Sequence, residues 1–99
     1  MSKKLLHIFH LLVYDRGEGV ILMETVFVHL HDKNDFNYVN EYYQFKRVPV
    51  EGEYLVTKVD GDWYKVELVV HTPTSKEMIA ELYAVKVDHN EEINKKTKM

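Results

Sequence analysis

The sequence predicts one mostly β domain, a small SH3-like or related β-barrel of five to six strands with a long N-terminal hairpin. Two long apolar runs, residues 3–14 and 20–31, are separated by a turn cluster, as in a hairpin. Residues 48–71 form two further alternating runs that meet at an Asp-Gly pair. Aromatic residues make up 12% of the chain, as is common in strands. The barrel is therefore assigned to residues 1–88.

The N-terminal hairpin has a register that its turn predicts. Pairing about Gly17 sets His10 opposite Glu24 and Ile8 opposite Val26. Further along, His7 falls opposite Phe27, and Leu5 opposite His29.

Both faces of this hairpin are apolar. A strand that is apolar on both faces is usually covered on both. We therefore expect one face to pack against a second copy of the chain or another partner, or else beneath residues 32–43.

Residues 32–40 are polar and rich in Asn, which favours a loop with at most one or two helical turns. Asn34 or Asp35 could cap such a turn, so a helix within 34–46 stays open. Residues 41–48 predict a strand.

The central hairpin is expected to turn at Asp60-Gly61, in the two-residue type I′ geometry that this dipeptide favours. Leu55 then lies opposite Val66. Alternation predicts a core face and an amphipathic outer face. The predicted core face comprises Leu55, Thr57, Val59, Tyr64, Val66, Leu68 and Val70. The predicted outer face comprises Tyr54, Val56, Lys58, Trp63, Lys65, Glu67, Val69 and His71.

Residues 48–54 read V-P-x-x-G-E-Y, and residues 63–71 read W-Y-x-V-x-x-V-x-H. This pattern resembles small uncharacterised proteins of bacteria, phages and mobile elements. The resemblance covers residues 48–87 and implies a bend leading into a short SH3-like barrel. It implies no activity, because the motif is structural.

The C-terminal part contains a connection at residues 72–77 and an alternating segment at 79–87, which predicts a strand. Thr74 and Glu77 have the spacing of a helix capping box, so 75–83 begins as either a strand or a helical turn. Residues 89–99 are charged and nearly without apolar side chains, which predicts a disordered tail.

Composition excludes several classes of protein. The absence of cysteine excludes disulfides and thiolate metal sites. A net charge of −3 argues against a general polyanion binder. The apolar start is interrupted by histidines and lacks a small-residue cleavage site, and no run is long enough to span a membrane. We expect a cytoplasmic protein that does not bind membranes.

Four residues of the central hairpin are the candidate partner-binding site: Tyr54, Lys58, Trp63 and Lys65. Aromatic side chains interleaved with cations can stack on bases or anchor a protein partner.

The histidines suggest two further sites. His10 opposite Glu24 predicts a pH-sensitive or interface pair, because a carboxylate fixes the tautomer of an imidazole. His7, His29 and His31 are weaker metal candidates, and no acidic side chain is clearly placed to complete their site. No cofactor is expected.

The sequence thus predicts a small non-enzymatic binding protein, expected to be a homodimer. Catalytic motifs for nucleotide, serine-hydrolase or zinc-protease chemistry are missing from the sequence. By association with phages and mobile elements, it would block a host defence protein or sequester a small nucleotide. A nucleic-acid-binding module is the alternative, and a His-dependent metal protein or small enzyme is the third interpretation.

Overall fold

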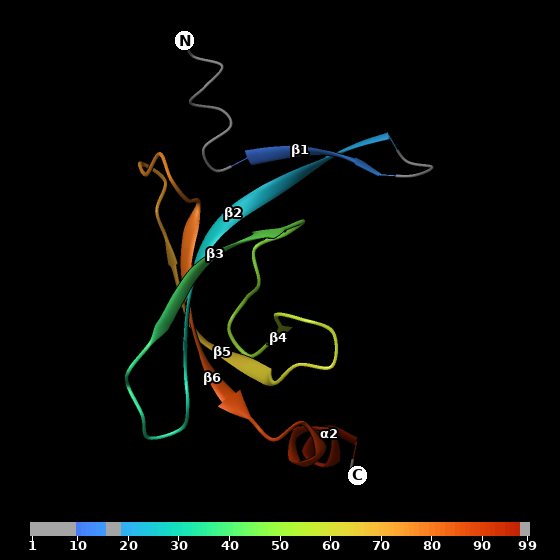
Figure 1. The fold of residues 1–99 in the computed structure, drawn as a ribbon, viewed down its shortest axis with the longest axis vertical. Helices are drawn as coiled ribbons and strands as arrows, with labels where there is room; N and C mark the ends of the chain where they lie inside the picture. The colour runs from blue at the N-terminus through green and yellow to red at the C-terminus, as the bar shows by residue number, and fades with distance from the viewer. Residues whose placement is uncertain (1–9, 16–18, 98–99) are drawn as a thin grey trace.

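The computed structural model describes residues 10–15 and 19–97, which form one curled, half-barrel sheet and a short helix (Figure 1). The prediction of a mostly β fold is therefore confirmed. The six strands follow the order β1-β2-β6-β5-β4, and β3 pairs with β2. Their bounds are β1 (His10–Asp15), β2 (Gly19–His31), β3 (Val39–Phe45), β4 (Tyr54–Val56), β5 (Trp63–His71) and β6 (Ala80–Val87), followed by α2 (His89–Thr97).

The long strand β2 links the parts of the sheet. Its first half pairs with β1, and its second half pairs with β3 and, in parallel, with β6. The predicted β1–β2 register is confirmed, since His10 lies opposite Glu24. The pairings predicted for Leu5, His7 and Ile8 lie outside the described residues.

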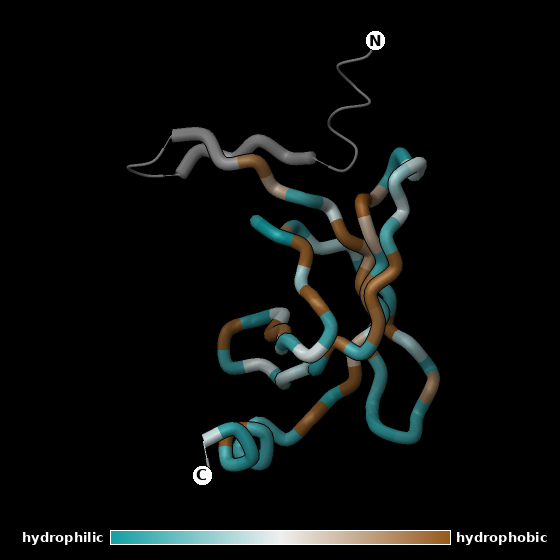
Figure 2. The backbone as a smooth tube through the Cα atoms, turned by 180° about the vertical axis from the view of Figure 1, so that it is seen from behind, coloured by the Kyte–Doolittle hydropathy of each residue, from teal (hydrophilic) through white to brown (hydrophobic). Residues whose placement is uncertain are grey.

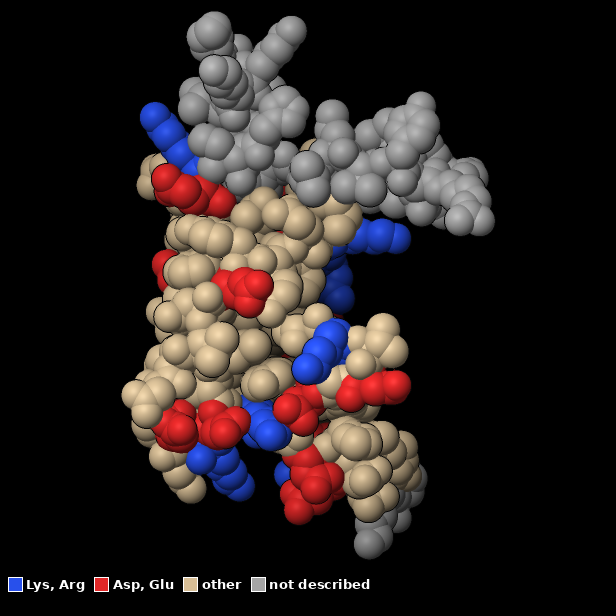
Figure 3. All heavy atoms as spheres, viewed as in Figure 1, with Lys and Arg blue, Asp and Glu red and all other residues tan. Residues whose placement is uncertain are grey.

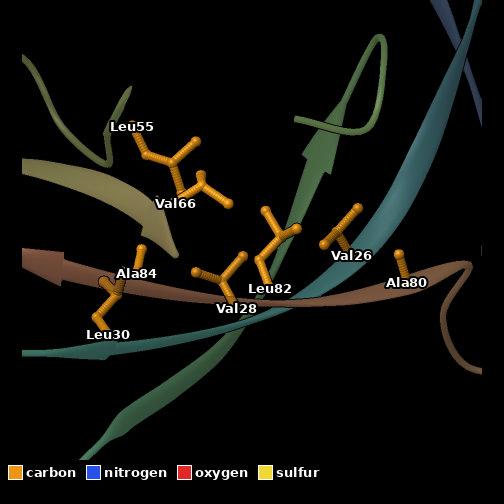
Figure 4. Close-up of a cluster of buried hydrophobic side chains, with 8 residues drawn as sticks. All are labelled: Val26, Val28, Leu30, Leu55, Val66, Ala80, Leu82 and Ala84. Atoms are coloured by element: carbon orange, nitrogen blue, oxygen red, sulfur yellow. The ribbon is translucent and has the colours of Figure 1, made fainter. Parts of the chain in front are cut away.

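The buried core lies on one side of this sheet (Figure 4). Alternate residues of β2 and β6 point toward Leu55 of β4 and Val66 of β5. Partly buried side chains from β3, β5 and the connections pack against this group. The buried apolar residues of the described chain are Val26, Val28, Leu30, Leu55, Val66, Ala80, Leu82 and Ala84.

A β-bulge in β5 changes the predicted core. Val66 pairs with Ala84, but the next pair joins Leu68 to Tyr83, so Glu67 is an extra residue on β5. Beyond the bulge the alternation is reversed. Leu68 and Val70, predicted to be buried, are exposed, whereas Val69 packs against the core. The predicted burial of Leu55 and Val66 is confirmed.

The central hairpin turns differently from the prediction. The Gly61 amide donates to the Lys58 carbonyl at 2.9 Å, and Asp60 takes the positive φ of 59°. The connection therefore spans residues 57–62, and its exposed Thr57 and Val59 do not join the core. Leu55 faces Tyr64, two residues from the predicted partner. Since side chains alternate with a period of two, this shift keeps the predicted faces of β4.

The V-P-x-x-G-E bend is a local hydrogen-bonded structure. The Glu53 carboxylate accepts the Val50 amide at 2.7 Å and both terminal Arg47 nitrogens at 3.0 and 2.9 Å. These bonds, Arg47 first and Val50 second, lower the pKa of Glu53. Gly52 has a φ of 93°, and its amide donates to the Val66 carbonyl at 2.9 Å. The motif thus ties the chain before β4 to β5.

Gly52→Ala should lower the free energy of unfolding by about 1–2 kcal/mol, the cost of the left-handed conformation for a residue with a Cβ. An added Cβ would meet no atom within 4 Å, so backbone strain alone is expected to act. Urea denaturation measures the loss, with Glu51→Ala as the exposed neighbouring control. Equal stability of the two variants would contradict the expectation that the positive φ of Gly52 is costly for a residue with a Cβ.

The connection before β3 is a loop, and residues 34–46 contain no helix. Asn34 has a φ of 64°, and the Asp35 amide donates to the Asp32 carbonyl at 3.0 Å. The Asp35 carboxylate in turn accepts the backbone and side-chain amides of Asn37. Short local bonds thus replace helical ones here.

The segment after β5 is a loop followed by a strand. This decides the alternative left open for residues 75–83, which do not begin with a helix. Ser75 Oγ accepts the amides of Glu77 and Met78 at 3.1 and 3.3 Å, and β6 then begins at Ala80.

The chain end differs from the predicted disordered tail, because His89–Thr97 forms α2. The Asp88 carboxylate accepts the Asn90 and Glu91 amides, which caps the first turn. Acidic residues begin the helix and lysines end it, in accord with the helix dipole.

Candidate partner-binding site

The outer side of the sheet, opposite the core, carries rings and histidines. On β2, Phe27, His29 and His31 alternate with the buried valines and leucine. The register places Tyr42 beside Phe27 and Tyr83 beside His29. We define the aromatic face as Phe27, Tyr38, Tyr42, Leu68, Val70 and Tyr83.

His29 is buried beneath these rings and hydrogen-bonded at both nitrogens. Nδ1 lies 2.6 Å from Asn40 Oδ1, and Nε2 lies 2.8 Å from Glu81 Oε1. The imidazole stacks on Tyr83, with ring centroids 4.5 Å apart, and meets Phe27 edge-on at 4.6 Å. Because an amide can present either its oxygen or its NH₂ group, both bonds are compatible with neutral or protonated His29.

His31 has a different hydrogen-bonding environment, since its partners are all acceptors. Nδ1 lies 2.7 Å from the Asp32 carbonyl and 3.0 Å from the Asp35 carbonyl. Nε2 lies 2.8 Å from a Glu67 carboxylate oxygen. An imidazole that satisfies carbonyls at one nitrogen and a carboxylate at the other must carry both protons. The geometry therefore favours the imidazolium form.

The electrostatics of His31 agree with this protonation state. Burial, the largest influence, lowers its pKa, but it is outweighed by the Glu67 bond, the Asp32 and Asp35 carbonyl bonds and the Glu67 charge. The net result is a pKa raised from 6.5. His31 thus joins β2, β5 and the loop before β3 through one charged ring.

That loop covers part of the outer face. Phe36 stacks on His31 with ring centroids 5.1 Å apart, and Tyr38 meets the edge of His31 at 5.0 Å and of Tyr83 at 5.7 Å. Phe36 and Tyr38 therefore cover the two histidines, whereas residues 39–43, expected to lie over the hairpin, pair beside β2 as part of β3. Elsewhere the face stays open, because 46% of Tyr42 and 50% of Leu68 are accessible.

The sequence-predicted partner site is brought together in part. Tyr54 lies opposite Lys65, and the Tyr54 and Trp63 rings lie 5.6 Å apart. Lys58 is in the connection after β4, outside the paired strands. We call Tyr54, Trp63 and Lys65 the platform; α2 contacts its two rings through a hydrogen bond and a ring contact.

Only some residues of the other predicted sites lie in the described part of the chain. His10 and Glu24 are cross-strand partners, and their functional role stays a prediction. His7 lies outside the described residues. All four ring nitrogens of His29 and His31 already bond protein groups. Within residues 10–15 and 19–97, no three His, Asp or Glu side chains converge as potential metal ligands.

A cleft of about 500 Å³ lies near the start of α2. Three aspartates and two lysines contribute to its lining, so its charges nearly balance, and Lys86 is already paired with Asp62. The lining residues are Asp32, Lys33, Asp62, Lys86, Val87, Asp88, His89 and Asn90.

Comparison with protein-family models, curated proteins and solved structures finds no match. In the described part of the chain, no helix has the length and apolar character needed to cross a membrane.

The aromatic face could not be predicted from the sequence, because its members come from distant segments. The available signal was the alternation of Phe27, His29 and His31 with buried residues on β2. Glu81 and Glu67, which complete the histidine bonds, lie on β6 and β5. Their placement depends on the parallel β2–β6 pair and on the bulge, neither of which the local pattern reveals.

Proposed function

We propose that the protein is a small non-enzymatic binding protein that engages a protein partner through the aromatic face. The supporting observation is that exposed Tyr42, Leu68 and Val70 lie on the same side of adjoining strands as Tyr83 and Phe27. Contiguous exposed apolar surface is typical of interaction sites, and tyrosine is enriched among residues that dominate binding energy.

The groups beneath this face support a rigid surface. His29 holds Asn40 of β3 and Glu81 of β6, and its ring supports Tyr83. Tyr42 stacks on Phe27 with ring centroids 4.4 Å apart. Rings that are held in place lose little conformational entropy on binding, which favours affinity.

The partner is proposed to be a second copy of the chain or a host protein, such as a defence protein blocked by a phage or mobile-element accessory factor. A small nucleotide is a weaker candidate, since three aspartates accompany the two lysines that line the cleft near α2. We propose a cytoplasmic location for the protein. Light scattering coupled to size exclusion distinguishes self-association from a foreign partner.

Leu68→Glu should abolish most binding without unfolding the protein, because Leu68 is half exposed on the aromatic face. A charge placed in an apolar interface should weaken binding roughly 30-fold or more, the effect of losing a dominant contact of about 2 kcal/mol. Self-association is measured by sedimentation, and capture of a host protein by a photo-cross-linker at Tyr42.

Val59→Glu is the matched control, because Val59 is 92% exposed in the connection after β4. Equal binding by both variants, with native circular dichroism, would overturn the assignment of this face. A salt series tests the nucleic-acid alternative, since phosphate binding weakens steeply with salt and apolar association does not.

A further inference from the structure

The helix α2 is joined to the platform by one hydrogen bond and one ring contact. Tyr54 Oη donates to Glu92 Oε1 at 2.5 Å, and the His89 ring lies 5.3 Å from the Trp63 ring. Glu92 is the buried residue of α2. The helix therefore presents one carboxylate and, three residues earlier, one ring to the platform.

Little else in α2 accounts for its position. Figure 2 shows the helix almost entirely in the hydrophilic colour, and its one aliphatic residue, Ile93, is exposed. A nine-residue helix is too short to be stable alone in water. Its position must therefore depend on contacts such as those of Glu92 and His89 with the platform.

The platform is suited to a carboxylate. The Tyr54 bond, followed by that of Lys95, lowers the pKa of Glu92 against the effect of burial, and the Lys65 charge adds to this. Tyr54 and Lys65 belong to the sheet, so two of these influences remain for any segment that replaces α2. The rings of Tyr54 and Trp63 supply the accompanying apolar surface.

We propose that Tyr54, Trp63 and Lys65 form a recognition site for a carboxylate-bearing helical segment of a partner protein, and that α2 occupies this site as an internal ligand. The partner segment carries a glutamate in the place of Glu92 and an aromatic or imidazole ring three residues earlier. It binds by displacing α2. This site is separate from the aromatic face and goes beyond the function proposed above.

The test uses the full chain and the one tryptophan in the sequence. Glu92→Gln removes the charge with little change in shape, so it should release α2 and change the indole signal of Trp63 in nitrogen–proton spectra. Glu91→Gln makes the same substitution at the exposed neighbouring position and should leave the wild-type signal. An unchanged Trp63 signal in Glu92→Gln would overturn the proposal.

A second measurement tests recognition in trans. A synthetic peptide of residues 88–97 is titrated into the full-length Glu92→Gln chain while the Trp63 signal is followed. The wild-type peptide should restore the wild-type signal in a saturable way, as should a peptide carrying Glu91→Gln. A peptide carrying Glu92→Gln should bind about tenfold or more weakly, because it lacks the charge-assisted hydrogen bond.

If all three peptides gave the same titration curve, or if none of them changed the Trp63 signal, the proposed recognition site would be overturned. Neither measurement involves the aromatic face, so Leu68→Glu should leave both results unchanged. The two proposals can therefore fail independently.

Discussion

Replacing His31 with phenylalanine is expected to lower the free energy of unfolding by about 2 kcal/mol and to remove a pH dependence of stability. The substitution keeps a ring against Phe36 but removes the donors to Asp32, Asp35 and Glu67. Hydrogen bonds that involve a charged group contribute about 1.5–3 kcal/mol. The side chain of Glu67 is 45% exposed, so solvent screens its share.

The direction of the pH dependence follows from the raised pKa of His31. In the unfolded chain the imidazole titrates near 6.5, and in the folded chain it titrates at higher pH. The stabilising contribution is therefore complete below about pH 6.5 and is lost as the pH rises through the folded-state pKa. Urea denaturation at pH 6 and pH 9 should show this loss in the wild type.

The matched control is His71→Phe, which changes an exposed histidine at the end of β5. It should retain the pH dependence that His31→Phe loses. A wild-type stability that does not fall between pH 6 and pH 9 would contradict the buried imidazolium.

Leu82→Ala should cause the largest loss of stability, about 2–5 kcal/mol, because it leaves a cavity in the core. Leu82 is fully buried on β6, between Val28 of β2 and Val69 of β5 in the register of the sheet. Domains are stable by only about 5–15 kcal/mol, so this variant should melt at a much lower temperature.

Leu68→Ala provides the control, since it removes the same atoms from an exposed position on β5. Its effect on stability should be within about 0.5 kcal/mol. A large loss of stability in Leu68→Ala would indicate that Leu68 is buried, as strict alternation predicts. It would therefore contradict the bulge at Glu67.

Local patterns predicted much of the fold but not its long-range pairings. The turn between the first two strands set a register that matches the structure, and period-two alternation identified Leu55 and Val66 as core. Alternation failed after Glu67, because one extra residue reverses every side chain that follows. Nothing in a short window shows that β2 and β6 pair in parallel.

The C-terminal helix and the aromatic face show the same limit of local sequence patterns. A charged segment with one aliphatic residue has little apolar surface to bury, yet it forms α2, whose carboxylate at Glu92 accepts a hydrogen bond from Tyr54. The platform rings could be predicted from neighbouring strands, whereas the aromatic face required four strands and the loop before β3 to converge. In Figure 3, lysine and arginine side chains are prominent on the side where the connections after β3 and β4 lie.

The pairing of β2 with β6 also affects how the chain is made. Val26 and its partner Ala80 are 54 positions apart, and loop closure over such distances slows folding. On the ribosome, β2 emerges several seconds before β6 at typical elongation rates of about 5–20 residues per second. During that interval Val26, Val28 and Leu30 lack their neighbouring core side chains Ala80, Leu82 and Ala84 of β6. The nascent chain should therefore be most prone to aggregation, and most dependent on chaperones, while β3 to β5 are being synthesised.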